Sequence, residues 1–121
     1  MYNCRPRGFR RPGESACATD AQEAERALGN ARHYASPEGR RTFRLPAGDT
    51  LPAPVVVRDE RVCERAGQAY GGPGSPPRRV VVVAVGGLFV VYDPYEPRAA
   101  GEWNVWLLFD RRWRPLGGIA S

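Results

Sequence analysis

The sequence predicts an α+β domain in which two helices pack on an antiparallel meander sheet of three to five strands. Most of the strongly apolar residues lie in the last third of the chain, Arg79–Ser121, as short β-branched and aromatic runs. Two earlier segments carry apolar residues at helical spacing. Both helical segments precede the consecutive strands, and this segregation is typical of α+β folds.

The first hairpin of the meander has the clearest sequence signal. Val80–Val85 is a continuous run of β-branched residues and alanine, and Leu88–Tyr92 is a second β run. Only Gly86 and Gly87 separate the two runs, and tight hairpin turns require the positive φ angles that glycine adopts easily. Asp93-Pro94 is expected to end the second strand, because proline lacks a backbone N–H donor.

A third strand is predicted at Trp103–Phe109, after a loop at Asp93–Glu102. The two-residue period of a strand places Trp103 and Phe109 on one face and Trp106 on the other. We expect Trp103 and Phe109 to be core residues, whereas Trp106 and Trp113 are the candidates for exposure. A last short strand is expected near Leu116–Ala120, where Pro115 fits only an edge position or a bulge.

Two helices are predicted before the meander. The first begins at a cap formed by Thr19 or Asp20 and runs to about Tyr34, with an apolar stripe at Ala24, Ala27, Leu28 and Ala31. The second is capped by Asp59, runs to about Tyr70 and is closed by Gly71-Gly72. Its apolar face consists of Val62, Cys63, Ala66, Ala69 and Tyr70.

The remaining segments between these elements are expected to be connectors. Ser36–Pro54 is rich in proline and glycine and leads into a short strand at Val55–Val57. Gly72–Arg79 is a Gly/Pro/Ser loop. The length of 121 residues fits one domain, for which we expect residues 16–121. Residues 1–15 are rich in Arg, Pro and Gly and are predicted to be a disordered basic tail.

The positive charge of the chain is concentrated in that tail. The formal net charge is +5, and four of the 18 basic residues lie in residues 1–13, which hold no acid. The rest of the chain has 14 arginines against 13 acids, so no clustered nucleic-acid face is expected. A basic tail that binds nucleic acid remains a weaker hypothesis. No apolar stretch approaches the length of roughly 20 residues that a membrane-spanning helix needs.

The cysteines leave two alternatives open. Cys4, Cys17 and Cys63 are an odd number without CxxC spacing, and the chain has one histidine, which argues against a zinc site. Cys17 and Cys63 could form a disulfide that leaves Cys4 free, or Cys63 could be a small buried apolar residue. No signal peptide is visible. A periplasmic or secreted location is expected if an export signal lies upstream, and a cytoplasmic one otherwise.

Motifs for catalysis or cofactor binding are absent from the sequence: it has no GxSxG, P-loop, GxGxxG or HExxH. We therefore expect no cofactor and no metal. Trp106 and Trp113, with Arg111 nearby, are the candidates for a surface that binds a partner protein. The alternative is a small ligand-binding domain or enzyme that uses Asp93 and Glu102, which a hairpin would bring together at one end of the sheet. The sequence favours the binding domain.

Several short motifs carry a resemblance to a known group of proteins. They are Val91-Tyr92-Asp93-Pro94, Gly101-Glu102-Trp103, Leu108-Phe109-Asp110 with Trp113, and Val62-Cys63-Glu64-Arg65-Ala66. In these motifs the chain resembles small hypothetical proteins of high-GC bacteria over residues 55–121. The resemblance implies a family that is often exported and has no assigned activity. The helix-then-meander order is also similar to cystatin-like and PepSY-like domains, and this similarity concerns the fold alone.

Overall fold

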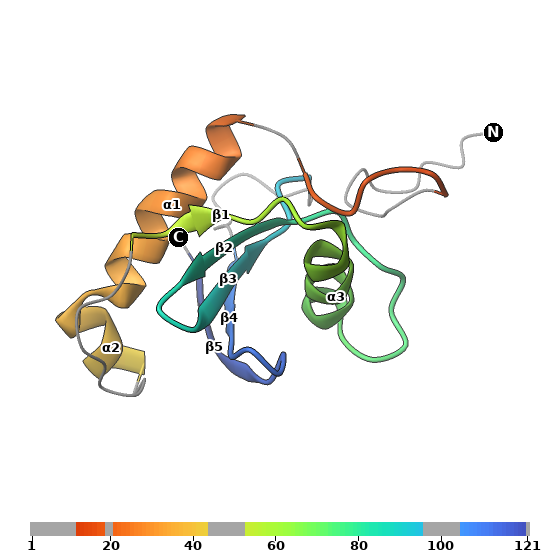
Figure 1. Ribbon diagram of the computed structural model, residues 1–121. Helices are drawn as coiled ribbons and strands as arrows, with labels where there is room; N and C mark the ends of the chain where they lie inside the picture. Colours follow the sequence, from red (N-terminus) through yellow and green to blue (C-terminus); the bar gives the residue numbers. More distant parts are fainter. Residues whose placement is uncertain (1–11, 19–20, 44–52, 96–104, 121) are drawn as a thin grey trace.

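The computed structural model describes residues 12–18, 21–43, 53–95 and 105–120 (Figure 1). It confirms an α+β fold with one five-stranded antiparallel sheet and three helices among these residues. The elements are α1 (Ala21–Ala35), α2 (Pro37–Phe43), β1 (Val55–Val56), α3 (Glu60–Gly71), β2 (Val81–Val85), β3 (Leu88–Tyr92), β4 (Val105–Phe109) and β5 (Pro115–Ala120).

The strands follow one another across the sheet in the order β1-β2-β3-β4-β5, and every neighbouring pair is antiparallel. The predicted hairpin is confirmed: Val85 pairs with Leu88, and Gly86 and Gly87 have φ angles of 52° and 84°. β5 is an edge strand, as Pro115 requires. Phe109 pairs with Pro115 and Leu108 with Gly117, so Leu116 forms a bulge in β5.

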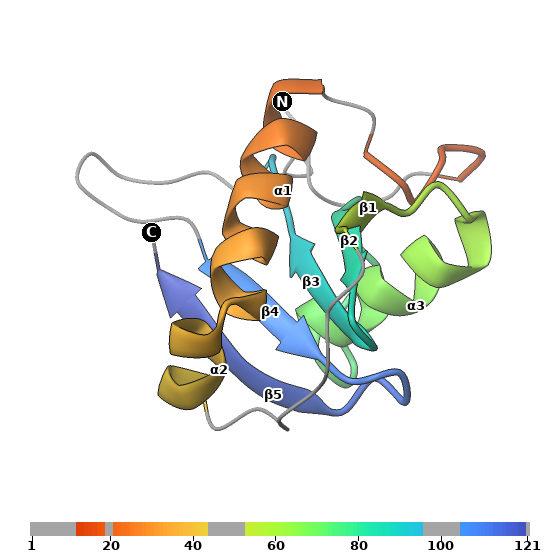
Figure 2. The ribbon, with the colours of Figure 1, turned by 60° about the vertical axis from the view of Figure 1, so that its left-hand side comes forward.

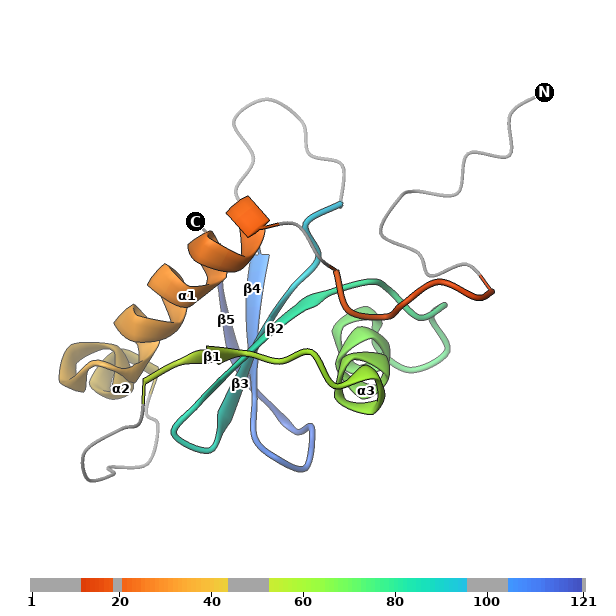
Figure 3. The ribbon, with the colours of Figure 1, turned by 45° about the horizontal axis from the view of Figure 1, so that its top comes forward.

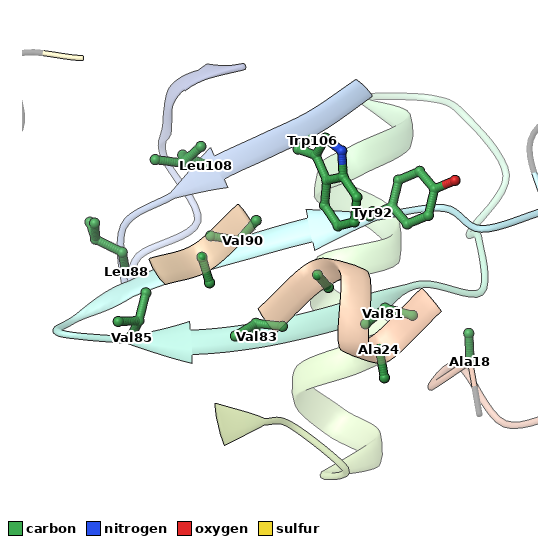
Figure 4. Close-up of a cluster of buried hydrophobic side chains, with 12 residues drawn as sticks. Ala18, Ala24, Val81, Val83, Val85, Leu88, Val90, Tyr92, Trp106 and Leu108 are labelled. Atoms are coloured by element: carbon green, nitrogen blue, oxygen red, sulfur yellow. The ribbon is translucent and has the colours of Figure 1, made fainter. Parts of the chain in front are cut away.

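Helices cover both faces of the sheet, with α1 on one side and α3 on the other (Figure 3). Figure 2 shows α1 running across the strands. The alanines of its predicted stripe pack against the side chains of one sheet face: Val81, Val83, Val85, Leu88, Val90, Tyr92, Trp106 and Leu108 (Figure 4). On the other face, Cys63 and Ala66 of α3 pack against Val80, Val82, Phe89, Val91 and Phe109.

The expectation that Trp106 is exposed is wrong. Its side chain is fully buried, and its ring stacks on Tyr92 with 4.2 Å between the ring centroids (Figure 4). The physical reason is that α1 covers this face of the sheet. The small alanine side chains of α1 leave volume beneath the helix, and Trp106 and Tyr92 fill part of it. Trp106 is therefore a core residue and is not part of a surface that a partner could contact. Trp103 lies outside the described residues.

Cys17 and Cys63 form a disulfide, with 5.2 Å between their Cα atoms. It joins the segment before α1 to the first turn of α3. The backbone around Cys17 also pairs with Val80, the residue before β2: Ala18 N donates to Val80 O at 2.8 Å, and Val80 N donates to Ala16 O at 3.0 Å. Ser15, the last residue of the predicted tail, donates from its Oγ to Glu60 at 2.6 Å. Residues 1–11 of that tail, with Cys4, lie outside the described residues.

α3 has the local signals that the sequence predicts. Asp59 caps it, and one carboxylate oxygen accepts from Val62 N at 3.1 Å. Gly67 brings the helix against the chain that precedes β2: a Cβ at this position would lie 2.2 Å from the backbone oxygen of Arg78. Only glycine permits this distance, so Gly67 sets how closely α3 approaches the sheet.

α2 was not predicted, since its residues lie in the expected connector. Its start has recognisable signals all the same: the Oγ of Ser36 accepts from Gly39 N at 3.0 Å, Pro37 is the first helical residue and Glu38 follows. The caps expected at Thr19 and Asp20 for α1 lie outside the described residues. None of the described helices is long and apolar enough to cross a membrane.

Candidate functional site

The turn between β4 and β5 is a hairpin loop of three residues, Arg111, Arg112 and Trp113, which Asp110 and Arg114 close by hydrogen bonds. Trp113 N donates to the backbone oxygen of Asp110 at 3.0 Å, and Asp110 N donates to Arg114 O at 3.1 Å. The carboxylate of Asp110 also accepts from Arg112 N and Arg114 N at 2.8 and 2.9 Å, and from the Nε of Arg114 at 2.6 Å. The backbone N–H of Arg114, then its guanidinium and the N–H of Arg112, lower the pKa of Asp110 below its ordinary value.

Trp113 occupies the position of this turn that requires a left-handed backbone. Its φ is 61°, and no other described residue besides glycine has a positive φ. Loops of this kind favour glycine at the left-handed position, because a Cβ there costs about 1–2 kcal/mol. A bulky residue at such a position is a genuine outlier. Backbone strain of this kind gathers at functional sites, so the side chain of Trp113 is the first candidate for a function.

The left-handed backbone lays the indole of Trp113 on the aromatic residues of the α3 face. Its ring stacks on Phe89 with 4.6 Å between centroids and 5° between planes, and it lies 5.9 Å from Phe109 in a tilted arrangement. Arg111, from the same turn, has its guanidinium 5.5 Å from the centroid of Phe89. The turn therefore places an indole and a guanidinium group against the same residue of the sheet, Phe89.

A cavity of about 700 Å³ lies beside Trp113, between the second half of α3 and the strands β4 and β5. Its wall on the helix side includes Arg65, Gln68 and Ala69. Its wall on the sheet side is apolar and consists of Leu107, Phe109, Trp113 and Pro115. The volume falls within the range of roughly 300–1,000 Å³ that is typical of ligand sites in proteins.

A smaller cavity of about 210 Å³ lies next to it and is lined by Arg61, Val62, Arg65, Phe89, Arg111 and Trp113. Arg65 and Trp113 line both cavities, so these two residues form the boundary between them. We call the two cavities together the α3–β4 groove. Three guanidinium groups stand around its smaller part, whereas no acidic residue lines either part among the described residues.

Asp93 has a different environment from the one the sequence suggests. It is 1% exposed, its carboxylate lies 3.0 Å from the guanidinium of Arg78, and it accepts from Tyr95 N at 2.8 Å. Arg78 in turn lies over the ring of Tyr70 in α3, 5.7 Å from its centroid. This arrangement ties the end of β3 to the end of α3. Glu102, the proposed second carboxylate, lies outside the described residues.

The structure thus brings together two of the predicted site residues, Trp113 and Arg111, and places Trp106 in the opposite core. Sequence reasoning missed the two arginines on the helix side of the groove, Arg61 and Arg65. The available signal was their i,i+4 spacing, which puts both side chains on one face of a helix. It could not show that the turn carrying Arg111 lies opposite that face.

Among the described residues there is no group of three or more His, Cys, Asp or Glu side chains that could hold a metal ion. No protein family, curated protein or solved structure matches the chain. The resemblance to proteins of high-GC bacteria therefore stays an expectation from the sequence, and function has to be argued from the groove itself.

Proposed function

We propose that this protein is a binding domain and that its α3–β4 groove receives a segment of a partner protein. The observation that carries this proposal is Trp113. A bulky side chain occupies a left-handed position that glycine would fill at lower cost, and Trp113 lines both cavities of the groove. The left-handed backbone at Trp113 costs about 1–2 kcal/mol, and this cost indicates that the indole has a function at this position.

The composition of the groove supports a protein partner. Tryptophan and arginine are the residue types most enriched among the few that dominate protein–protein binding energy. Here Trp113 is only half-buried, and Arg61, Arg65 and Arg111 are exposed around it. Apolar side chains of β4 and β5 next to them offer a pocket for one apolar side chain of the partner. An aromatic anchor of this type, surrounded by a polar rim, is the common anatomy of an interface centre.

Asp93 gives little support to the alternative of a ligand-binding site or enzyme at the end of β3. A carboxylate that acts as an acid or base must reach a ligand, whereas Asp93 is buried and engaged by Arg78 and by the backbone of Tyr95. We assign it a structural role in holding α3 against the sheet.

The test uses Trp113→Asn, because asparagine tolerates a left-handed backbone and removes the ring. Proteins captured from cells of the source organism by the native protein are compared with those captured by the variant. The captured partner is then purified and its affinity measured for both. Loss of an interface anchor is expected to weaken binding by about 2 kcal/mol, or roughly 30-fold.

Val55→Ser is the matched control, since Val55 is 61% exposed on β1 at the opposite edge of the sheet. This change removes exposed apolar surface far from the groove and should leave the affinity unchanged. Circular dichroism and urea unfolding establish that both variants are folded. A partner that binds the folded Trp113→Asn variant with native affinity would overturn the proposed function.

A further inference from the structure

The arginines around the smaller cavity of the groove differ from several other arginines of the protein. Arg26, Arg78, Arg79 and Arg114 each form an ion pair with a carboxylate. Arg61, Arg65 and Arg111 form none with the residues that the structure describes, although all three line one cavity of about 210 Å³. Arg58 and Arg112 also form no ion pair with a described residue, but they line neither cavity.

Three like charges at one place are unfavourable for the isolated protein. Arg61 and Arg65 are one helical turn apart on α3, where like charges repel by a few tenths of a kcal/mol. Arg111 approaches the same cavity from the β4–β5 turn. An anion in this cavity would relieve the repulsion and could accept paired hydrogen bonds, because the guanidinium fork matches the geometry of a carboxylate.

We propose that the ligand of the groove is an acidic segment of a partner protein that carries an apolar side chain next to its carboxylates. The apolar side chain enters the larger cavity, against Leu107, Phe109 and Pro115. The carboxylates contact Arg61, Arg65 and Arg111 on the other side of Trp113. This inference rests on the proposed function and adds the chemical class of the partner.

An acidic protein segment fits this groove better than a nucleic acid does. A nucleic acid presents a phosphate at every residue and needs a continuous basic track. Here the basic residues border the smaller cavity, while the sheet side of the larger cavity is apolar. Beyond residues 1–13, the chain has only one more arginine than it has acids, 14 against 13. Among the residues that the structure describes, three arginines thus stand beside an apolar pocket.

Three short peptides serve as probes in the experiment. The first has a central leucine flanked by glutamates, the second has lysines in place of the glutamates, and the third has glycine in place of the leucine. Their affinities for the full-length protein are measured by fluorescence anisotropy at low and at moderate salt. We expect the first peptide to bind at least about tenfold tighter than each of the others, and its affinity to fall with salt.

Charge reversal at the helix side of the groove provides the specific test. In the double variant Arg61→Glu/Arg65→Glu, the preference should change from the glutamate peptide to the lysine peptide. Arg32→Glu/Arg58→Glu is the control, because it makes the same total charge change at two exposed residues that line neither cavity. This variant should keep the native preference.

The outcomes separate this inference from the function on which it rests. If the native protein does not prefer the glutamate peptide, or if the double variant keeps the native preference, the acidic ligand is wrong. A single-stranded oligonucleotide that displaces the glutamate peptide and binds more tightly would also overturn it. In either case the groove remains a binding site as long as the captured partner is lost in Trp113→Asn. If that variant keeps its partner, both proposals fail.

Discussion

Reduction of the Cys17–Cys63 disulfide should remove a large part of the stability of the protein. The bond joins residues 46 positions apart, so it constrains a long loop of the unfolded chain. For a loop of this length, the chain-entropy relation gives about 4 kcal/mol at room temperature. Domains of this kind typically have a total free energy of unfolding of roughly 5–15 kcal/mol.

The structure also indicates what remains after reduction. The backbone pairing of Ala16 and Ala18 with Val80, and the bonds from Ser15 and Ala16 to the Glu60 carboxylate, do not depend on the disulfide. The cores on both faces of the sheet are likewise retained. We therefore expect a reduced protein that is folded but much less stable.

The assay is urea unfolding of a Cys4→Ser variant with and without reductant, because Cys4 could otherwise exchange with the disulfide. With a urea dependence of about 2 kcal/mol/M, a loss of 4 kcal/mol lowers the midpoint by about 2 M. Alkylation of the non-reduced native protein should modify one cysteine, because the other two are joined in the disulfide. An unchanged midpoint, or three alkylated cysteines, would refute the reasoning.

Two further predictions concern the elements that form the groove. Gly67→Ala should destabilise the protein by about 1–3 kcal/mol, because its Cβ would lie 2.2 Å from Arg78 O. Gly29→Ala in α1, which would meet nothing within 4 Å, should stabilise it by up to about 1 kcal/mol. Thermal unfolding compares the two, and equal effects would contradict the close approach of α3. The hydrogen bonds that lower the pKa of Asp110 favour its ionised form. The ionised carboxylate therefore stabilises the turn at pH values above the ordinary pKa of aspartate, near 3.8, and this stabilisation is lost as the pH falls through the lowered pKa. At low pH the Trp113 ring should therefore be held less firmly against Phe89 in the native protein, and Asp110→Asn should remove this pH dependence. An NMR titration of the Trp113 indole that is the same in both proteins would contradict this role of Asp110.

Much of the fold could be predicted because local signals and tertiary structure agree. Gly86-Gly87 between two β runs specified the hairpin, and Asp59 with Gly71-Gly72 specified the limits of α3. The position of Trp106 was predicted incorrectly because the period of a strand separates its two faces without telling which face is covered. The unbroken apolar run of β2 was the relevant signal, since such runs are typical of strands buried on both sides.

The groove was only half predictable, for a related reason. Trp113 and Arg111 were recognisable as aromatic and cationic residues in a turn. The left-handed backbone of Trp113 depends on the hydrogen bonds of the Asp110 turn, and the composition of the chain does not show them. Arg61 and Arg65 belong to the site only because the disulfide and the close approach at Gly67 hold α3 against this face of the sheet. Such long-range geometry has no local signature in the sequence.

The central claim is that the α3–β4 groove is a binding site, and the tryptophan indoles test it most directly. In the ¹⁵N-labelled protein, the indole N–H signals of Trp106 and Trp113 are assigned by substitution and followed while the glutamate–leucine peptide is added. The Trp113 signal should shift, together with backbone signals of Arg65, Ala69 and Leu107. The Trp106 signal should stay in place, since that side chain is buried on the opposite face of the sheet. Saturable binding that leaves Trp113 unchanged and shifts signals elsewhere would contradict the account.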